Sequence, residues 1–113
     1  MSMMNEGKAL GRVVHRKEIF SWNLLPILDN SIPSHQRGAG VKVLPGENND
    51  SFRIGKGLLF NKKTDAYVDN TGFFPEVYIT APEGEQVAKN IVHALEAKGF
   101  KPRLHRGLPE VLQ

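Results

Sequence analysis

The chain has 113 residues and a net charge of +3, and 40% of its residues are hydrophobic, which suits one domain with a single core. It contains no cysteine, so disulfides and thiolate zinc sites are excluded and no oxidising compartment is implied. No apolar run is long enough to span a bilayer, and the first residues lack the order of a signal peptide, so we expect a cytoplasmic protein without membrane contact.

The beginning of the chain predicts a tail followed by an apolar helix. Residues 1–8 are expected to be a flexible tail ahead of a single α+β domain at residues 9–113. A helix is predicted over residues 16–28, bent or divided at Pro26. Its apolar side chains either join the core or dock on a second copy or another protein. The candidate partner interface comprises Phe20, Trp22, Leu24 and Leu25.

Residues 31–40 are predicted to be turn and loop, because Pro33, Gly38 and Gly40 interrupt regular structure. His35 and Arg37 in this loop could supply an imidazole for acid–base chemistry and a guanidinium for developing charge. They are the catalytic candidates, and the alternative is an ordinary polar loop. No metal site and no cofactor are expected, since the four histidines show no spacing that would place two on one helical face.

The middle of the chain predicts antiparallel strands. A short alternating segment at residues 41–44 precedes a polar loop and an extended segment at residues 51–60. Gly55 and Gly57 interrupt that segment, which indicates a feature of backbone geometry such as a bulge. A phosphate loop is not favoured, because no helix opened by Ser or Thr follows. A hairpin connection at residues 61–64 should lead into a strand at residues 66–68.

Residues 76–106 carry the most consistent signals, those of a strand, a helix and a second strand. Branched and aromatic residues predict a strand at residues 76–80, and Thr80 and Glu83 fit a capping box at the start of the helix. Gly99 should end the helix. The helical stripe that would face a sheet comprises Val87, Ala88, Ile91, Val92 and Leu95. A strand around residues 103–105 would lie parallel to the first.

Residues 77–100 resemble the strand–helix–strand half of ferredoxin-like folds, including the peptidoglycan-binding SPOR modules. The resemblance covers about a quarter of the chain and carries over no site residue. The expected fold class is α+β: a mixed, mostly antiparallel sheet with helices on one face and a C-terminal strand–helix–strand (ferredoxin-like half) unit.

Charge is unevenly distributed along the chain. Residues 65–97 contain six acidic residues and one lysine, a net charge of −5, so the remainder carries +8. Basic residues on one face could bind phosphates while sheet aromatics such as Phe52, Phe60 and Tyr67 stack on bases, although alternation favours the core for Phe52. The alternative is scattered solvated lysines. The candidate nucleic-acid-binding residues are Arg53, Lys56, Lys62, Lys63, Lys101, Arg103 and Arg106.

Three functions remain open from the sequence. The leading hypothesis is a small non-enzymatic binding or adaptor protein that contacts a protein partner or self-associates, because no catalytic pattern stands out. The second is a nucleic-acid-binding protein that uses the clustered basic residues and sheet aromatics. The third is a small metal-free hydrolase or ribonuclease-like enzyme.

Overall fold

The computed structural model describes residues 21–57 and 62–113, with the side chains of residues 24–57 and 63–113. The expected tail, Phe20 and Phe60 lie outside the described residues, as do the side chains of Trp22 and Lys62. The elements are α1 (Ser21–Asn30), α2 (Ser34–Gly38), β1 (Val41–Pro45), β2 (Ser51–Gly57), β3 (Lys62–Asp69), β4 (Glu76–Ile79), the 3-10 helix η2 (Pro82–Gly84), α3 (Glu85–Ala97), β5 (Arg103–Arg106) and the 3-10 helix η3 (Glu110–Leu112).

The described strands form one mixed sheet in the order β1-β2-β3-β4-β5. β1 to β4 pair antiparallel with their chain neighbours, whereas β5 pairs parallel with β4. A parallel pair needs a crossover, and α3 provides it. These features confirm the α+β class and the mostly antiparallel sheet. β4 and β5 are direct neighbours, so the unit is an unsplit crossover, and the resemblance to ferredoxin-like folds stays a prediction.

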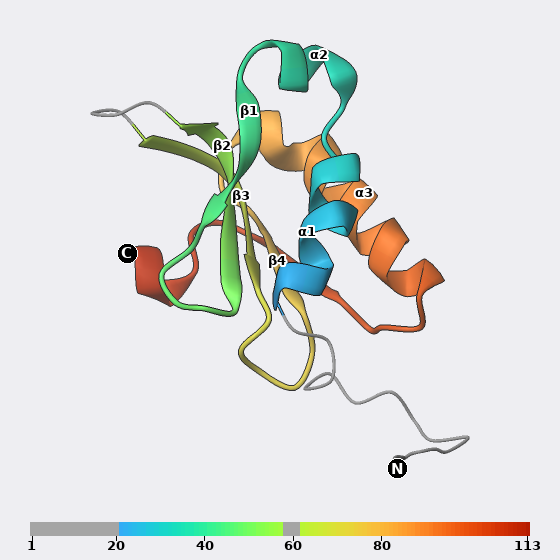
Figure 1. The fold of residues 1–113 in the computed structure, drawn as a ribbon. Helices are drawn as coiled ribbons and strands as arrows, with labels where there is room; N and C mark the ends of the chain where they lie inside the picture. The colour runs from blue at the N-terminus through green and yellow to red at the C-terminus, as the bar shows by residue number, and fades with distance from the viewer. Residues whose placement is uncertain (1–20, 58–61) are drawn as a thin grey trace.

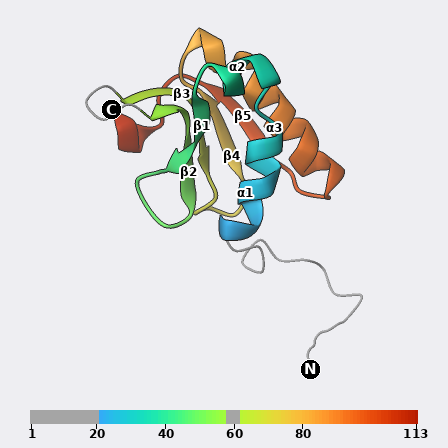
Figure 2. The same ribbon diagram turned by 45° about the horizontal axis from the view of Figure 1, so that its top comes forward.

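Helices α1 and α3 cover the same face of the sheet, which confirms the predicted layering (Figures 1 and 2). The predicted stripe of α3 lies on the sheet, with Val87, Ala88, Ile91 and Leu95 buried and Val92 partly buried. α1 contributes Leu24 and Leu28 to the same core. The sheet side of the core comprises Val41, Phe52, Ile54, Ala66, Val68, Val77 and Ile79. In β2 and β3 the core positions alternate as a half-covered sheet requires.

The start of α3 differs from the predicted capping box. The chain first makes the 3-10 turn η2, and neither η2 nor α3 has a side-chain cap. The Thr80 hydroxyl instead donates to the carbonyl oxygen of Thr64, at 2.7 Å, across to β3. The capping box is therefore wrong, because Ala81 stands at the N-cap of η2 and Gly84 at that of α3, so Thr80 is not at a cap position. The predicted end is confirmed, since Gly99 follows the helix with φ of 92°.

Two further expectations need correction. Residues 34–38 form the short helix α2 rather than a loop, and Pro33 before it has φ of −57° and accepts from the amides of Gln36 and Arg37. The hairpin connection expected at residues 61–64 is misplaced, because β3 already begins at Lys62. Lys63 and Thr64 pair with β2, which extends the strand by four residues ahead of Ala66.

Candidate functional site

A cleft of about 330 Å³ lies where α2 meets β1, β2, β3 and η2. It is lined by His35, Gln36, Ala39, Val41, Lys56, Lys63, Asp65 and Glu83. We call it the α2 cleft. It combines two lysines, two carboxylates, an imidazole and a primary amide with an apolar wall from Ala39 and Val41. Such a hollow, with a few polar groups converging on it, is the usual form of a ligand site.

Asp65 occupies a bulge that directs its side chain towards the cleft. Ile54 pairs with Ala66 and Gly55 with Thr64, so Asp65 is the extra residue in β3. A bulge breaks the alternation of a strand and re-aims a side chain. Gly55 is required opposite the bulge, because a Cβ there would overlap the carbonyl oxygen of Lys63. The bulge predicted at this glycine is therefore confirmed, and its consequence is the placement of a carboxylate that alternation would have put on the other face.

The backbone carbonyl of Asp65 is fixed by hydrogen bonds and by close packing. Its carbonyl oxygen accepts from the amides of Thr80 and Ala81, at 3.0 and 3.2 Å. Gly84 in η2 packs directly against the same carbonyl, and no side chain would fit there. The turn after β4 and the 3-10 helix η2 thus both pack against the bulge. This rigidity gives the carboxylate a defined direction before any ligand arrives.

The Asp65 carboxylate is buried and incompletely satisfied. Its residue is only 4% exposed, and its Oδ1 atom has no hydrogen-bond partner among the described residues. Burial raises the pKa of Asp65, the amine of Lys63 opposes that rise, Glu83 adds to it, and Lys56 again opposes it. A buried acceptor without a donor costs about 1–3 kcal/mol, so this atom lowers the free energy of unfolding.

A second unsatisfied acceptor belongs to Gln36, which also lines the cleft. The Nε2 atom of Gln36 donates to the backbone carbonyl of Glu83, at 2.8 Å, which joins α2 to η2. Because a carbonyl can only accept, the atom of Gln36 that contacts it must be the NH2 group, which fixes the orientation of the side-chain amide. The Oε1 atom then does not take part in this bond. Oε1 is buried and has no partner among the described residues. Two buried acceptors of residues that line the α2 cleft therefore lack hydrogen-bond donors among the described residues.

Lys63 and Glu83 form an ion pair at the rim of the cleft. Their side chains are 3.2 Å apart and about half exposed. The pKa of Glu83 is lowered first by a hydrogen bond to its own backbone amide and then by Lys63. The pair bridges β3 and η2 and neutralises two of the charges that line the cleft. Exposed pairs of this kind contribute little to stability.

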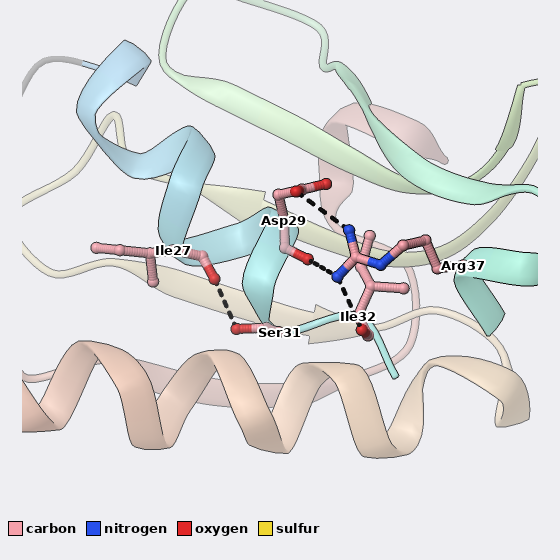
Figure 3. Close-up of polar contacts among 5 residues, drawn as sticks. All are labelled: Ile27, Asp29, Ser31, Ile32 and Arg37. Atoms are coloured by element: carbon pink, nitrogen blue, oxygen red, sulfur yellow. Dashed lines mark hydrogen bonds and ion pairs between the residues drawn. The ribbon is translucent and has the colours of Figure 1, made fainter. Parts of the chain in front are cut away.

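Arg37 does not point into the α2 cleft but holds α2 against the end of α1 (Figure 3). Its guanidinium donates to Oδ2 of Asp29 at 3.1 Å, to the backbone oxygen of Asp29 at 2.7 Å and to that of Ile32 at 3.2 Å. The Ser31 hydroxyl donates to the Ile27 carbonyl beside it. These donors reach carbonyls in the last turn of α1 and in the segment just after it. Arg37 is thus a positioning residue for the wall that carries His35 and Gln36.

The candidate nucleic-acid-binding residues whose side chains are described make several different contacts. Lys56 and Lys63 line the α2 cleft, whereas Arg106 forms a bidentate pair with Glu85 of α3. Arg103 lies 3.8 Å from Glu76 and 4.5 Å above the Phe74 ring. Lys101 is exposed in the segment after α3. Paired guanidiniums are less available for phosphates, and the nucleic-acid hypothesis stays a prediction.

A cross-sheet row occupies the sheet face opposite α1 and α3. It consists of Arg53, Tyr67, Tyr78 and His105, which are successive register partners from β2 to β5. The Tyr78 ring stacks on His105 with centroids 4.7 Å apart and meets Tyr67 edge-on at 6.4 Å. Tyr67 is fully buried, and its hydroxyl accepts from the Glu47 amide. The inner rings contact one another, so the row resembles a stabilising cross-strand ladder more than a stacking platform for bases.

The apolar residues of α1 separate into core and surface. Leu24 is 2% exposed and packs in the core, which removes it from the surface available to a partner. Leu25 is 42% exposed and borders a shallow hollow of about 350 Å³ together with Pro26, Asp29, Lys42 and Val43. The interface hypothesis therefore rests on Leu25 within the described side chains.

Comparisons with known proteins do not assign the chain to a family. No protein-family model matches the chain, and no curated protein or solved structure is significantly similar to it. None of the helices in residues 21–57 and 62–113 combines the length and apolarity of a membrane span. Within the same residues, no three histidine, aspartate or glutamate side chains gather closely enough to bind a metal ion.

The sequence interpretation identified part of the α2 cleft and missed its centre. His35, Lys56 and Lys63 were candidates for two different functions, and the structure brings all three to one hollow. Asp65 and Gln36 were not candidates. The one signal near Asp65 was the bulge predicted at Gly55, and which residue lies opposite that glycine depends on the strand register. Gln36 had no such signal, since its partner Glu83 is 47 residues away in the chain.

Proposed function

We propose that this protein is a non-enzymatic binding protein that holds a small polar ligand in the α2 cleft. The observation that carries the proposal is the pair of buried acceptors, Asp65 Oδ1 and Gln36 Oε1, which lack donors among the described residues. Native folds leave few buried polar atoms unpaired, so each such atom calls for an explanation, and a functional role is one of them. A ligand that brings N–H or O–H groups would satisfy both.

The size and composition of the cleft agree with a small ligand. Its volume of about 330 Å³ is close to the lower end of the range for small-molecule sites. Its walls come from five elements and the segment between α2 and β1, so a ligand would contact parts of the chain distant in sequence. The bulge and the Arg37 contacts hold two of these walls in place. A preorganised site of this kind loses little entropy when it binds.

Acid–base chemistry at the same cleft is a second candidate. A carboxyl group whose pKa is raised keeps its proton to higher pH and suits general acid catalysis. His35 lines the same cleft and could exchange the proton. Mass spectrometry of each bound compound after incubation distinguishes the two candidates. Conversion that disappears in Asp65→Ala supports the enzyme, and unchanged compounds support binding alone.

A protein partner or a second copy at the α1 surface is the remaining candidate. The observation in its favour is the exposed Leu25 side chain beside the hollow between α1 and β1. Exposed apolar groups of this size are common, so one such group is a modest argument. Light scattering tests self-association directly. A concentration-dependent dimer that Leu25→Ser abolishes supports it, and a monomer at every concentration contradicts self-association.

The test of the binding proposal is a screen of small polar compounds by ¹H–¹⁵N NMR. We expect binders to shift the side-chain amide of Gln36 and the backbone amides of Lys63, Asp65 and Glu83. The shifts should be lost in Asp65→Ala, because that change removes one of the two acceptors. Asp50→Ala is the matched control, since Asp50 is exposed in the loop between β1 and β2. If no compound shifts these signals, or if Asp65→Ala binds equally well, the proposal is wrong.

A further inference from the structure

Pairing within the α2 cleft leaves one negative and one positive group without an ion-pair partner. Lys63 and Glu83 neutralise each other at 3.2 Å. The remaining charged groups that line the cleft are the Asp65 carboxylate and the Lys56 amine. Lys56 lowers the pKa values of both Asp65 and Glu83 from a distance, and no ion pair joins it to a carboxylate in the described residues. The cleft thus presents separate negative and positive groups to an incoming molecule.

The negative side of the cleft suits a group with several donors. Asp65 Oδ1 and Gln36 Oε1 are two acceptors that lack donors among the described residues. An ammonium group has three N–H donors and one positive charge, so it could serve both acceptors and compensate the carboxylate. A neutral hydroxyl has one donor and could serve one acceptor only.

The positive side suits an anion at the same time. A carboxylate beside the Lys56 amine would gain a charge-assisted hydrogen bond, whereas a purely cationic ligand would be repelled by that amine. A purely anionic ligand would meet the Asp65 carboxylate. A molecule that carries both charges avoids both penalties, and it adds no net charge to the cleft.

The dimensions and the apolar wall restrict the molecule further. A volume of about 330 Å³ corresponds to roughly eleven water molecules at about 30 Å³ each. Val41 is 5% exposed and forms part of the wall with Ala39. This wall could contact a short aliphatic group, while the polar groups on the other walls take the charges.

We propose that the α2 cleft binds a free α-amino acid, with its ammonium group on Asp65 and Gln36 and its carboxylate on Lys56. The inference rests on the proposed binding function and specifies its ligand. The termini of peptides share parts of this chemistry but carry only one of the two charges at a time. Blocked amino acids therefore separate a free amino acid from a peptide end.

The experiment measures the affinities of the twenty common α-amino acids by NMR titration of the full chain. For the tightest binder, the N-acetylated form and the carboxamide form are titrated alongside. We expect each blocked form to bind at least about tenfold more weakly, since each loses one charged contact worth about 1.4 kcal/mol or more. Equal affinity of the acetylated form would reassign the site to C-terminal carboxylates, and equal affinity of the carboxamide to N-terminal amines. Either result overturns the proposal.

Two variants test the assigned contacts. Lys56→Gln should weaken amino-acid binding at least about tenfold, and Lys98→Gln is the matched control on an exposed lysine after α3. Lys56 is exposed, so we expect its variant to fold, and a thermal melt checks this. Unchanged affinity in Lys56→Gln contradicts the proposal. If no amino acid binds while other compounds shift the NMR signals of the cleft, the amino-acid inference is wrong and the proposed binding function is supported. If nothing binds, both are wrong.

Discussion

Replacing the buried carboxylate of Asp65 with an amide should stabilise the unliganded protein. The residue is 4% exposed, and its Oδ1 atom lacks a donor in the described part of the chain. Asn has nearly the same shape but carries no charge, so Asp65→Asn removes the desolvation of an ionised group without creating a cavity. Most substitutions in a buried site destabilise, which makes a gain in stability a discriminating result.

The magnitude follows from the balance at the site. A buried acceptor without a donor costs about 1–3 kcal/mol, and more when it is charged. Because Asn keeps an acceptor at this place, the substitution removes only the additional cost of the charge, of which the attraction of Lys63 and Lys56 already recovers part. We therefore expect Asp65→Asn to raise the free energy of unfolding by about 1 kcal/mol at neutral pH. For a domain of this size, that corresponds to roughly 4 °C or more in Tm.

The gain should depend on pH in a definite direction. The folded-state pKa of Asp65 is raised above its ordinary value of 3.8, so the folded protein retains this proton after the unfolded chain has lost it. The contribution of Asp65 to stability therefore falls as pH rises from about 4 and becomes constant above the folded-state pKa. Below pH 4 the carboxyl is protonated in both states. The advantage of Asn should accordingly be small there and grow with increasing pH.

Urea unfolding of both proteins across the pH range tests this prediction, with Asp50→Asn as the exposed control. The difference between wild type and Asp65→Asn should follow the stated pH dependence, and the control should change little. A destabilised Asp65→Asn protein, or a difference that is constant across the pH range, would show that the carboxylate has a stabilising partner. The argument for an unsatisfied site would then be wrong.

Three further predictions concern Gly84 and Arg37, which hold the walls of the cleft, and the ion pair at the start of α3. Gly84→Ala should destabilise by at least about 2 kcal/mol in urea unfolding, because its Cβ overlaps a backbone carbonyl of β3, whereas Gly72→Ala, with open space around it, should be nearly neutral. Arg37→Ala should cost about 1–2 kcal/mol and shift the NMR signals of α2, since it removes three hydrogen bonds to the end of α1. Unchanged α2 signals would contradict the positioning role. Hydrogen bonds from Arg106 and then Lys89 hold the pKa of Glu85 at about 2, so the stability that these contacts provide should decline as pH falls from 4.5 towards 2. Glu85→Gln should remove that part of the acid profile.

Local patterns were reliable wherever neighbouring residues decided the structure. The apolar stripe of α3 was predicted and confirmed because helical periodicity requires only residues three and four apart. The bulge expected at Gly55 was likewise confirmed, although its extra residue, Asp65, belongs to β3 and β2 continues to Gly57. Predictions that depended on a hydrogen-bond partner were weaker. Thr80 lost its expected capping role because the chain makes the 3-10 turn η2 before α3, with Ala81 and Gly84 at the N-caps, while its hydroxyl donates to Thr64, 16 residues earlier.

The sequence by itself determined the α+β class, the antiparallel strands before the C-terminal crossover, and the α3 face that lies on the sheet. These follow from periodicity, turn residues and helix stops, which act over a few residues. Only the tertiary structure decided that His35, Lys56 and Lys63 meet Asp65 in one cleft while Arg37 turns to α1. The physical reason is that strand register and one bulge set which side chains converge, and those depend on the pairing of segments far apart in the chain.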